Sequence, residues 1–138
     1  MLLTFLLLNI CLAYSLRVPI ATTYSKKYPL RVNIFDKELV VWWNNDKWCA
    51  TNDMCLHRQA SLSKGVITKD GNIKCGYHGW EYNNCGKCVY IPSSIQQLDL
   101  SNDKYEIEEK HEMLWFIDNS QHDNENIFDN VFNDYIFT

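Results

Sequence analysis

The sequence predicts an all-β protein, built as a two-sheet antiparallel sandwich with two metal-ligand loops at one end. Short stretches rich in β-branched and aromatic residues recur along the chain and are separated by turn residues, which is typical of strands. No stretch shows sustained helical periodicity. At 138 residues, with 46% hydrophobic and 22% charged residues, the chain has the length and composition of one globular domain.

The predicted strands share an alternating pattern or an enrichment in β-branched and aromatic residues. In chain order they are 18–20, 31–35, 38–43, 47–51, 66–68, 72–74, 80–82, 104–108 and 113–117. Pro19 makes the first an edge strand, because proline cannot donate a ladder hydrogen bond. Residues 44–46 form a turn, and Asp70-Gly71 predicts a tight hairpin that would bring the second ligand loop back beside the first.

The two ends of the chain differ in composition from the 16–118 segment, which we interpret as the domain. Residues 1–15 are almost wholly apolar and resemble a signal peptide. They are fewer than the roughly 20 residues of a spanning helix, so a short membrane anchor is the second interpretation. Residues 119–138 are acidic and aromatic. They are expected either to fold back on the domain or to begin a missing catalytic domain.

Two pairs of metal-ligand residues lie on the two predicted loops. Cys55 and His57 have one residue between them, and Cys75 and His78 have two. Two thiolates and two imidazoles suit either a tetrahedral zinc or a [2Fe–2S] cluster in which two Cys hold one iron and two His hold the other. The Cys-x-His spacing favours the cluster, because alternate residues of a tight loop leave it in a similar direction. A zinc-stabilised structural module is kept as the alternative.

The residues around these pairs resemble the two ligand boxes of Rieske oxygenases. The boxes are Cys55-Leu56-His57-Arg58 and Cys75-Gly76-Tyr77-His78-Gly79-Trp80. The 84–92 segment is similar to the pheophorbide a oxygenase and chlorophyllide a oxygenase branch. Leu56 stands where the family usually has Pro, so the first loop is less restricted in φ. The resemblance implies a Rieske-type sandwich with one [2Fe–2S] cluster, held by Cys55, His57, Cys75 and His78.

The resemblance implies an oxygenase, but the residues present support electron transfer rather than oxygen insertion by this chain. A Rieske oxygenase also needs a mononuclear iron, held by two His and a carboxylate. Only His111 and His122 remain for it, eleven residues apart, so we assign no catalytic residue. We expect the electron-transfer domain of a pheophorbide/chlorophyllide a oxygenase-like oxidoreductase, which delivers electrons to a mononuclear iron site outside this chain. A free-standing Rieske ferredoxin-like shuttle is the alternative.

The charges of the chain are divided unevenly. Residues 1–98 hold 11 Lys and Arg against 6 Asp and Glu, whereas residues 99–138 hold 2 against 11. The basic part either steers an acidic electron donor, such as a ferredoxin or reductase, or is a solvated surface of mixed charge. We expect a separate or missing mononuclear-iron domain as a second partner, and no nucleic acid. The resemblance implies a plastid protein that enters through an N-terminal signal and is either soluble or membrane-associated, with the secretory pathway as the alternative.

Three further features of the ligand boxes carry expectations. The outer nitrogens of His57 and His78 should face solvent. Tyr77 either donates its hydroxyl to a ligand sulfur or has a packing role only, and Trp80 is expected to pack in the core under the loop. The disulfide that accompanies respiratory Rieske clusters is not expected. For Cys85 and Cys88 a redox pair, a disulfide and two buried thiols are all open, and buried thiols are favoured.

Overall fold

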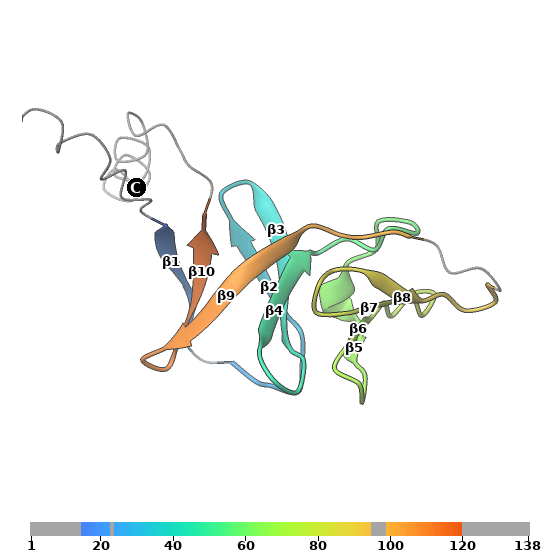
Figure 1. Cartoon of the computed structure of the whole chain (residues 1–138), viewed down its shortest axis with the longest axis horizontal. Coiled ribbons are helices and arrows are strands. Elements are labelled where there is room, and N and C mark those ends of the chain that lie inside the picture. Colours follow the sequence, from blue (N-terminus) through green and yellow to red (C-terminus); the bar gives the residue numbers. More distant parts are fainter. Residues whose placement is uncertain (1–14, 23, 95–98, 120–138) are drawn as a thin grey trace, which may run out of the picture. The chain divides into compact units, whose positions relative to one another are not determined.

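The computed structural model describes residues 15–22, 24–94 and 99–119 (Figure 1). Nearly all of the predicted leader and the predicted tail lie outside these residues. No helix in the described part of the chain is long and apolar enough to cross a membrane. The segment Arg17–Ile117 folds as one compact unit.

The described residues form two antiparallel sheets, which confirms the predicted all-β class. A six-stranded sheet has the order β1-β10-β9-β4-β3-β2, and a four-stranded sheet has the order β5-β6-β7-β8 (Figure 1). The elements are β1 Leu16–Ala21, β2 Leu30–Ile34, β3 Lys37–Trp43, β4 Trp48–Asn52, the short 3₁₀ turn η1 Leu62–Lys64, β5 Val66–Ile67, β6 Ile73–Lys74, β7 Glu81–Tyr82, β8 Cys88–Tyr90, β9 Lys104–Lys110 and β10 Met113–Asp118. The strand β8 was not predicted.

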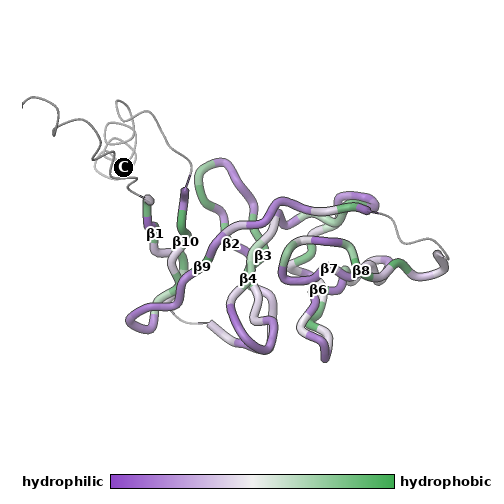
Figure 2. Tube along the Cα trace, viewed as in Figure 1, coloured by the Kyte–Doolittle hydropathy of each residue, from purple (hydrophilic) through white to green (hydrophobic). Residues whose placement is uncertain are grey.

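Tight turns organise the six-stranded sheet. The β2–β3 hairpin turns at Phe35 and Asp36, whose φ values of 45° and 43° match the two-residue turns that fit the twist of a hairpin. His111 and Glu112 have φ values of 55° and 58° and join β9 to β10 in the same way. Figure 2 shows hydrophilic residues gathered at the β9–β10 turn, whereas β10 itself is mostly hydrophobic.

The four-stranded sheet has one buried face and one exposed face. Its cross-strand register places Ile67, Ile73, Tyr82 and Cys88 opposite one another, and the last three are fully buried. The predicted hairpin is confirmed. It turns at Gly71, whose φ of 79° would strain any residue with a Cβ and whose position lies against the backbone of Asn44.

A buried cluster of side chains fills the space between the two sheets. It takes Val40, Trp42 and Cys49 from the large sheet, and Ile73, Tyr82 and Cys88 from the small one. The indole Nε1 of Trp42 donates to the Gly71 carbonyl at 3.0 Å, so this large side chain is buried with its polar atom satisfied. Burial of a large apolar side chain contributes about 1.5–3 kcal/mol. This core therefore supports the base of both ligand loops.

A second buried cluster covers the other face of the large sheet. It is formed by Val32, Leu39, Val41, Trp48, Ala50, Leu114 and Phe116. Because alternate residues of β3 point to opposite faces, Leu39–Trp42 contribute to both clusters and are all fully buried. β3 is thus the central support of the fold.

Candidate metal centre

The first loop, residues 53–61, connects β4 to η1 and carries Cys55 and His57. The amide of Cys55 donates to the Ala60 carbonyl at 2.8 Å, and the amide of Gln59 donates to the Cys55 carbonyl at 2.8 Å. Gln59 has a φ of 59°. These bonds make a compact turn in which only one residue takes the left-handed conformation.

The second loop, residues 75–80, connects β6 to β7 and repeats this turn. The amide of Cys75 donates to the Trp80 carbonyl at 2.8 Å, and the amide of Gly79 donates to the Cys75 carbonyl at 3.0 Å. Gly79 has a φ of 75°, at the position that corresponds to Gln59. The fold therefore builds the same turn twice, each time with a cysteine at its start.

The structure brings the four predicted ligand residues together. Cys55 and Cys75 are buried, with exposed fractions of 2% and 3%. His57 and His78 are exposed, and their ring centroids lie 4.8 Å apart at an interplanar angle of 77°. Two thiols thus lie inside, and two imidazoles lie at the surface.

The environment sets the protonation of these groups. Burial raises the pKa of the Cys55 thiol, while a hydrogen bond with Tyr82 acts in the opposite direction. Partial desolvation lowers the pKa of His57, and the neighbouring His78 and Arg58 lower it further. Both effects favour the neutral imidazole, which is the form that binds a metal.

A hydroxyl group contacts one ligand sulfur, but it belongs to Tyr82 and not to Tyr77. Tyr82 Oη lies 3.3 Å from Cys55 Sγ and accepts the Leu56 amide at 2.9 Å. Burial, followed by the Cys55 contact, raises the pKa of Tyr82. Tyr77 is 70% exposed, and its ring meets the His78 ring edge-on at 4.3 Å. The expected sulfur bond of Tyr77 is therefore wrong, and its ring packs on His78.

Trp80 packs against the core as predicted and also contacts a predicted ligand. Its ring lies nearly parallel to the His57 imidazole, with centroids 4.9 Å apart and an interplanar angle of 10°. A half-buried indole that is fixed by the core restricts the orientation of the imidazole stacked on it. Trp80 thus joins the second loop to the first.

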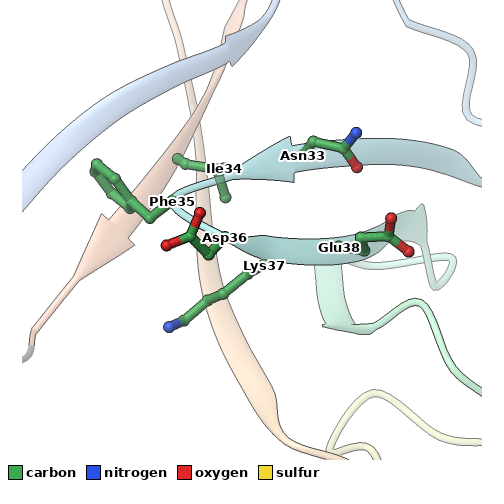
Figure 3. A pocket seen from close by; sticks show the side chains of 6 residues that line it. All are labelled: Asn33, Ile34, Phe35, Asp36, Lys37 and Glu38. Atoms are coloured by element: carbon green, nitrogen blue, oxygen red, sulfur yellow. The ribbon is translucent and has the colours of Figure 1, made fainter. Parts of the chain in front are cut away.

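The remaining predicted residues lie elsewhere. The five cysteines in the described residues are free thiols. Cys88 is buried, but Cys85 is exposed, so the prediction of two buried thiols holds only for Cys88. His111 is exposed in the β9–β10 turn, and His122 lies outside the described residues. A surface hollow near the β2–β3 turn is lined by residues 33–38 and contains none of the predicted ligands (Figure 3).

The donor set fits a binuclear cluster. A tetrahedral zinc needs four ligands around one point, whereas a cluster with mixed ligands takes a thiolate pair on one iron and an imidazole pair on the other. The inner thiol pair and the outer imidazole pair match the second arrangement.

Comparison with known proteins identifies the family. Residues 16–104 match the model of the Rieske [2Fe–2S] domain. The chain belongs to this family. The cofactor of a Rieske domain is a [2Fe–2S] cluster, so the zinc module that the spacing left open is not supported. The role of the domain is electron transfer.

Several relatives of this Rieske domain are chloroplast proteins. Pheophorbide a oxygenase of Arabidopsis thaliana is 40% identical over 68 residues, which are 48% of this chain and 13% of that protein. The protochlorophyllide-dependent translocon component 52 of the same plant is 35% identical over 115 residues, which are 75% of this chain and 20% of that protein. The chain thus spans a fifth or less of the length of these two relatives.

Solved structures confirm the Rieske fold. NdmA of Pseudomonas putida with caffeine has a TM-score of 0.63 and 30% identity, over 72% of this chain and 32% of that one. Dicamba monooxygenase with non-heme iron and dicamba has a TM-score of 0.67 and 26% identity, over 75% of this chain and 33% of that one. The Rieske domain described here therefore corresponds to about a third of each neighbour.

Proposed function

We propose that Cys55, His57, Cys75 and His78 hold the cluster, and that the domain delivers electrons to a mononuclear iron site outside this chain. The parent activity would be that of a pheophorbide/chlorophyllide a oxygenase-like oxidoreductase. The observation that carries the proposal is the pair of equivalent loops, which bring two buried thiols and two exposed imidazoles into one site. The relatives support the oxygenase branch.

The bound cluster would accept and release one electron at a time. The protein excludes water from the thiolates, because Cys55 and Cys75 are buried against the core. The exposed edges of His57 and His78 give an electron the shortest route to a partner at the surface. Trp80 and Tyr82 fix the ring of His57 and the sulfur of Cys55 from the inner side.

The positive charges near the two loops favour an acidic electron donor, such as a ferredoxin or reductase, as the partner. Arg58 and Lys64 are exposed on the loop side and belong to no ion pair found in the described residues. The one acidic side chain at the second loop, Glu81, is 16% exposed and binds Lys74 at 3.2 Å. A net positive rim around the imidazoles favours a negatively charged partner.

We further propose that residues 16–118 are the domain and that the protein acts in the plastid. The chloroplastic relatives support this location. Residues 1–15 would then be the entry signal or a short anchor, and residues 119–138 would be a fold-back tail or the start of a catalytic domain. Import of the full chain into isolated plastids would support the plastid location. Secretion of the chain into the medium would support the secretory pathway instead.

Single-ligand variants test the assignment. We expect the full chain, reconstituted anaerobically, to bind about two irons and two sulfides. Cys55→Ser, Cys75→Ser, His57→Ala and His78→Ala should each lose most of this iron and sulfide. Cys85→Ser and His111→Ala are matched controls on exposed residues and should retain it. Full retention in a ligand variant would contradict the assignment of that residue.

A mixing experiment separates the oxygenase component from the free shuttle. An oxygenase component should form a complex with a mononuclear-iron catalytic domain that survives gel filtration. A shuttle should exchange electrons with that domain without forming a stable complex.

A further inference from the structure

Asp53 is the only Asp, Glu, Lys, Arg or His that is buried among the described residues. Its side chain has an exposed fraction of 0%. Burial of a carboxylate is costly unless hydrogen bonds and opposite charge compensate for the lost water. The partners of Asp53 therefore indicate what this costly group stabilises.

Both oxygens of the Asp53 carboxylate bind the same residue. The amide of Ser63 donates to Oδ1 at 2.6 Å, and the hydroxyl of Ser63 donates to Oδ2 at 2.6 Å. Arg31 Nε, from β2, lies 3.8 Å from Oδ2 and supplies part of the opposite charge. Arg31 also binds Glu38 at 2.8 Å, so it is shared between two carboxylates.

The two ligand loops are closed at their bases in different ways. β6 and β7 pair directly, with Lys74 opposite Glu81, so a backbone ladder closes the second loop. The first loop is flanked by β4, which pairs with β3 and β9, and by η1, which is not a strand, so no ladder pairs these two elements with each other. The Asp53–Ser63 hydrogen bonds join the two ends of the first loop at the place where the second loop has its ladder.

We infer that Asp53 is a positioning residue of the redox site, which fixes the first loop against the second and lowers the reduction potential. The inference rests on the proposed function, because it takes Cys55 and His57 as ligands. Asp53 precedes Cys55 by two residues, and a fixed negative charge beside a redox group opposes the addition of an electron. Arg31 acts in the opposite direction because its charge is positive.

Redox titration of the loaded full chain tests the electrostatic part. Asp53→Asn keeps the size of the side chain and an acceptor for the Ser63 amide, but removes the charge. Its midpoint potential should rise, and that of Arg31→Gln should fall. Glu112→Gln, on an exposed residue of the β9–β10 turn, is the control and should match the wild type. A potential for Asp53→Asn equal to that of the control would overturn the inference.

Amide hydrogen exchange of the metal-free full chain tests the positioning part. Ser63→Ala removes the hydroxyl bond and keeps the amide bond, so the protein should still fold. Amides of residues 54–61 should exchange faster than in the wild type, while those of residues 75–80 should not change. Equal exchange of the first loop in both proteins would contradict the positioning role.

The two measurements also separate the inference from the proposed function. If the wild-type chain binds no iron and sulfide, the proposed function fails, and the exchange of the first loop still decides whether Asp53 positions it. If the wild type is loaded but Asp53→Asn and Ser63→Ala behave like it in both measurements, only the inference fails.

Discussion

The hydroxyl of Tyr82 is the polar group that contacts the sulfur of a proposed ligand from within the core. A ligand thiolate has no proton, so the hydroxyl must donate to it, and this bond favours the reduced cluster by withdrawing charge from the sulfur. Tyr82→Phe should therefore lower the reduction potential. One hydrogen bond of about 0.5–1.5 kcal/mol corresponds to about 20–60 mV for one electron. Redox titration measures it.

Tyr105→Phe is the control for this change. The Tyr105 hydroxyl donates to Asn52 Oδ1 at 2.8 Å, and the Tyr105 side chain packs against the second buried cluster. Its loss should leave the potential unchanged. Equal shifts in the two variants would show that the hydroxyl of Tyr82 acts on the fold and not on the sulfur.

At the scale of single residues, the sequence predicted which four residues come together but not all of the groups that support them. The four residues could be predicted because a tight loop brings Cys and His side chains together only at certain spacings. Tyr82 was missed because it lies on β7, after the second ligand box. Only the structure shows that its side chain points into the core, toward Cys55. Asp53 was missed because its importance comes from Ser63, ten residues away.

At the scale of elements, the two equivalent turns carry different residues at the left-handed position. Gly79 has no Cβ, and an added one would lie 3.3 Å from Pro92 Cγ. Gly79→Ala should reduce the free energy of unfolding by about 1–2 kcal/mol, because a left-handed φ is costly for a residue with a Cβ. Gln59→Gly should raise it by up to about 1 kcal/mol, since the strain it removes exceeds the added entropy of the unfolded chain.

Urea denaturation of the two variants provides the measurement. Opposite signs at equivalent positions are the expected result. Destabilisation by both changes would mean that the Gln59 side chain contributes contacts that outweigh its backbone strain.

The hydrogen bonds of Glu109, on β9, predict a pH dependence of stability. Glu109 accepts a hydrogen bond from the Tyr24 hydroxyl at 2.6 Å and another from the Trp48 indole at 2.8 Å. These bonds lower the pKa of Glu109, so its contribution is complete above the ordinary value of 4.5 and is lost as pH falls through the folded-state pKa. The hydrogen bond with Glu109 also raises the pKa of Tyr24 from 10.0 to about 12. The stability that this bond contributes is therefore lost as pH rises from 10.0 to about 12.

Tyr24→Phe removes the bond that links the two groups. Thermal unfolding against pH should show a shallower loss of stability on both the acid and the alkaline side. Tyr28→Phe, on a tyrosine that is 70% exposed, should keep the wild-type profile. An unchanged profile in Tyr24→Phe would contradict the role of this hydrogen bond.

Most strands could be predicted, because alternation and β-branched residues are local signals. β8 was missed because its three residues pair across a bulge in β7. The pairing of β4 with β9 joins residues more than fifty positions apart, and no local pattern encodes such an order.

At the scale of the whole molecule, the positive rim of the imidazole end should control the rate of electron delivery. We expect Arg58→Gln and Lys64→Gln to slow reduction by an acidic plant-type ferredoxin several-fold at low salt, and less at high salt. Lys110→Gln, at the end of β9, removes the same charge away from the ligand loops. Stopped-flow kinetics at two ionic strengths measures these rates of reduction. Equal rates for all three variants would contradict the role of the positive rim in docking.

The account as a whole depends on two imidazoles and two thiolates sharing one binuclear cluster. Pulsed EPR of the reduced full chain, grown with ¹⁵N-labelled histidine, measures this directly. We predict a rhombic signal with couplings from two histidine nitrogens. A reduced cluster without histidine coupling would contradict the account.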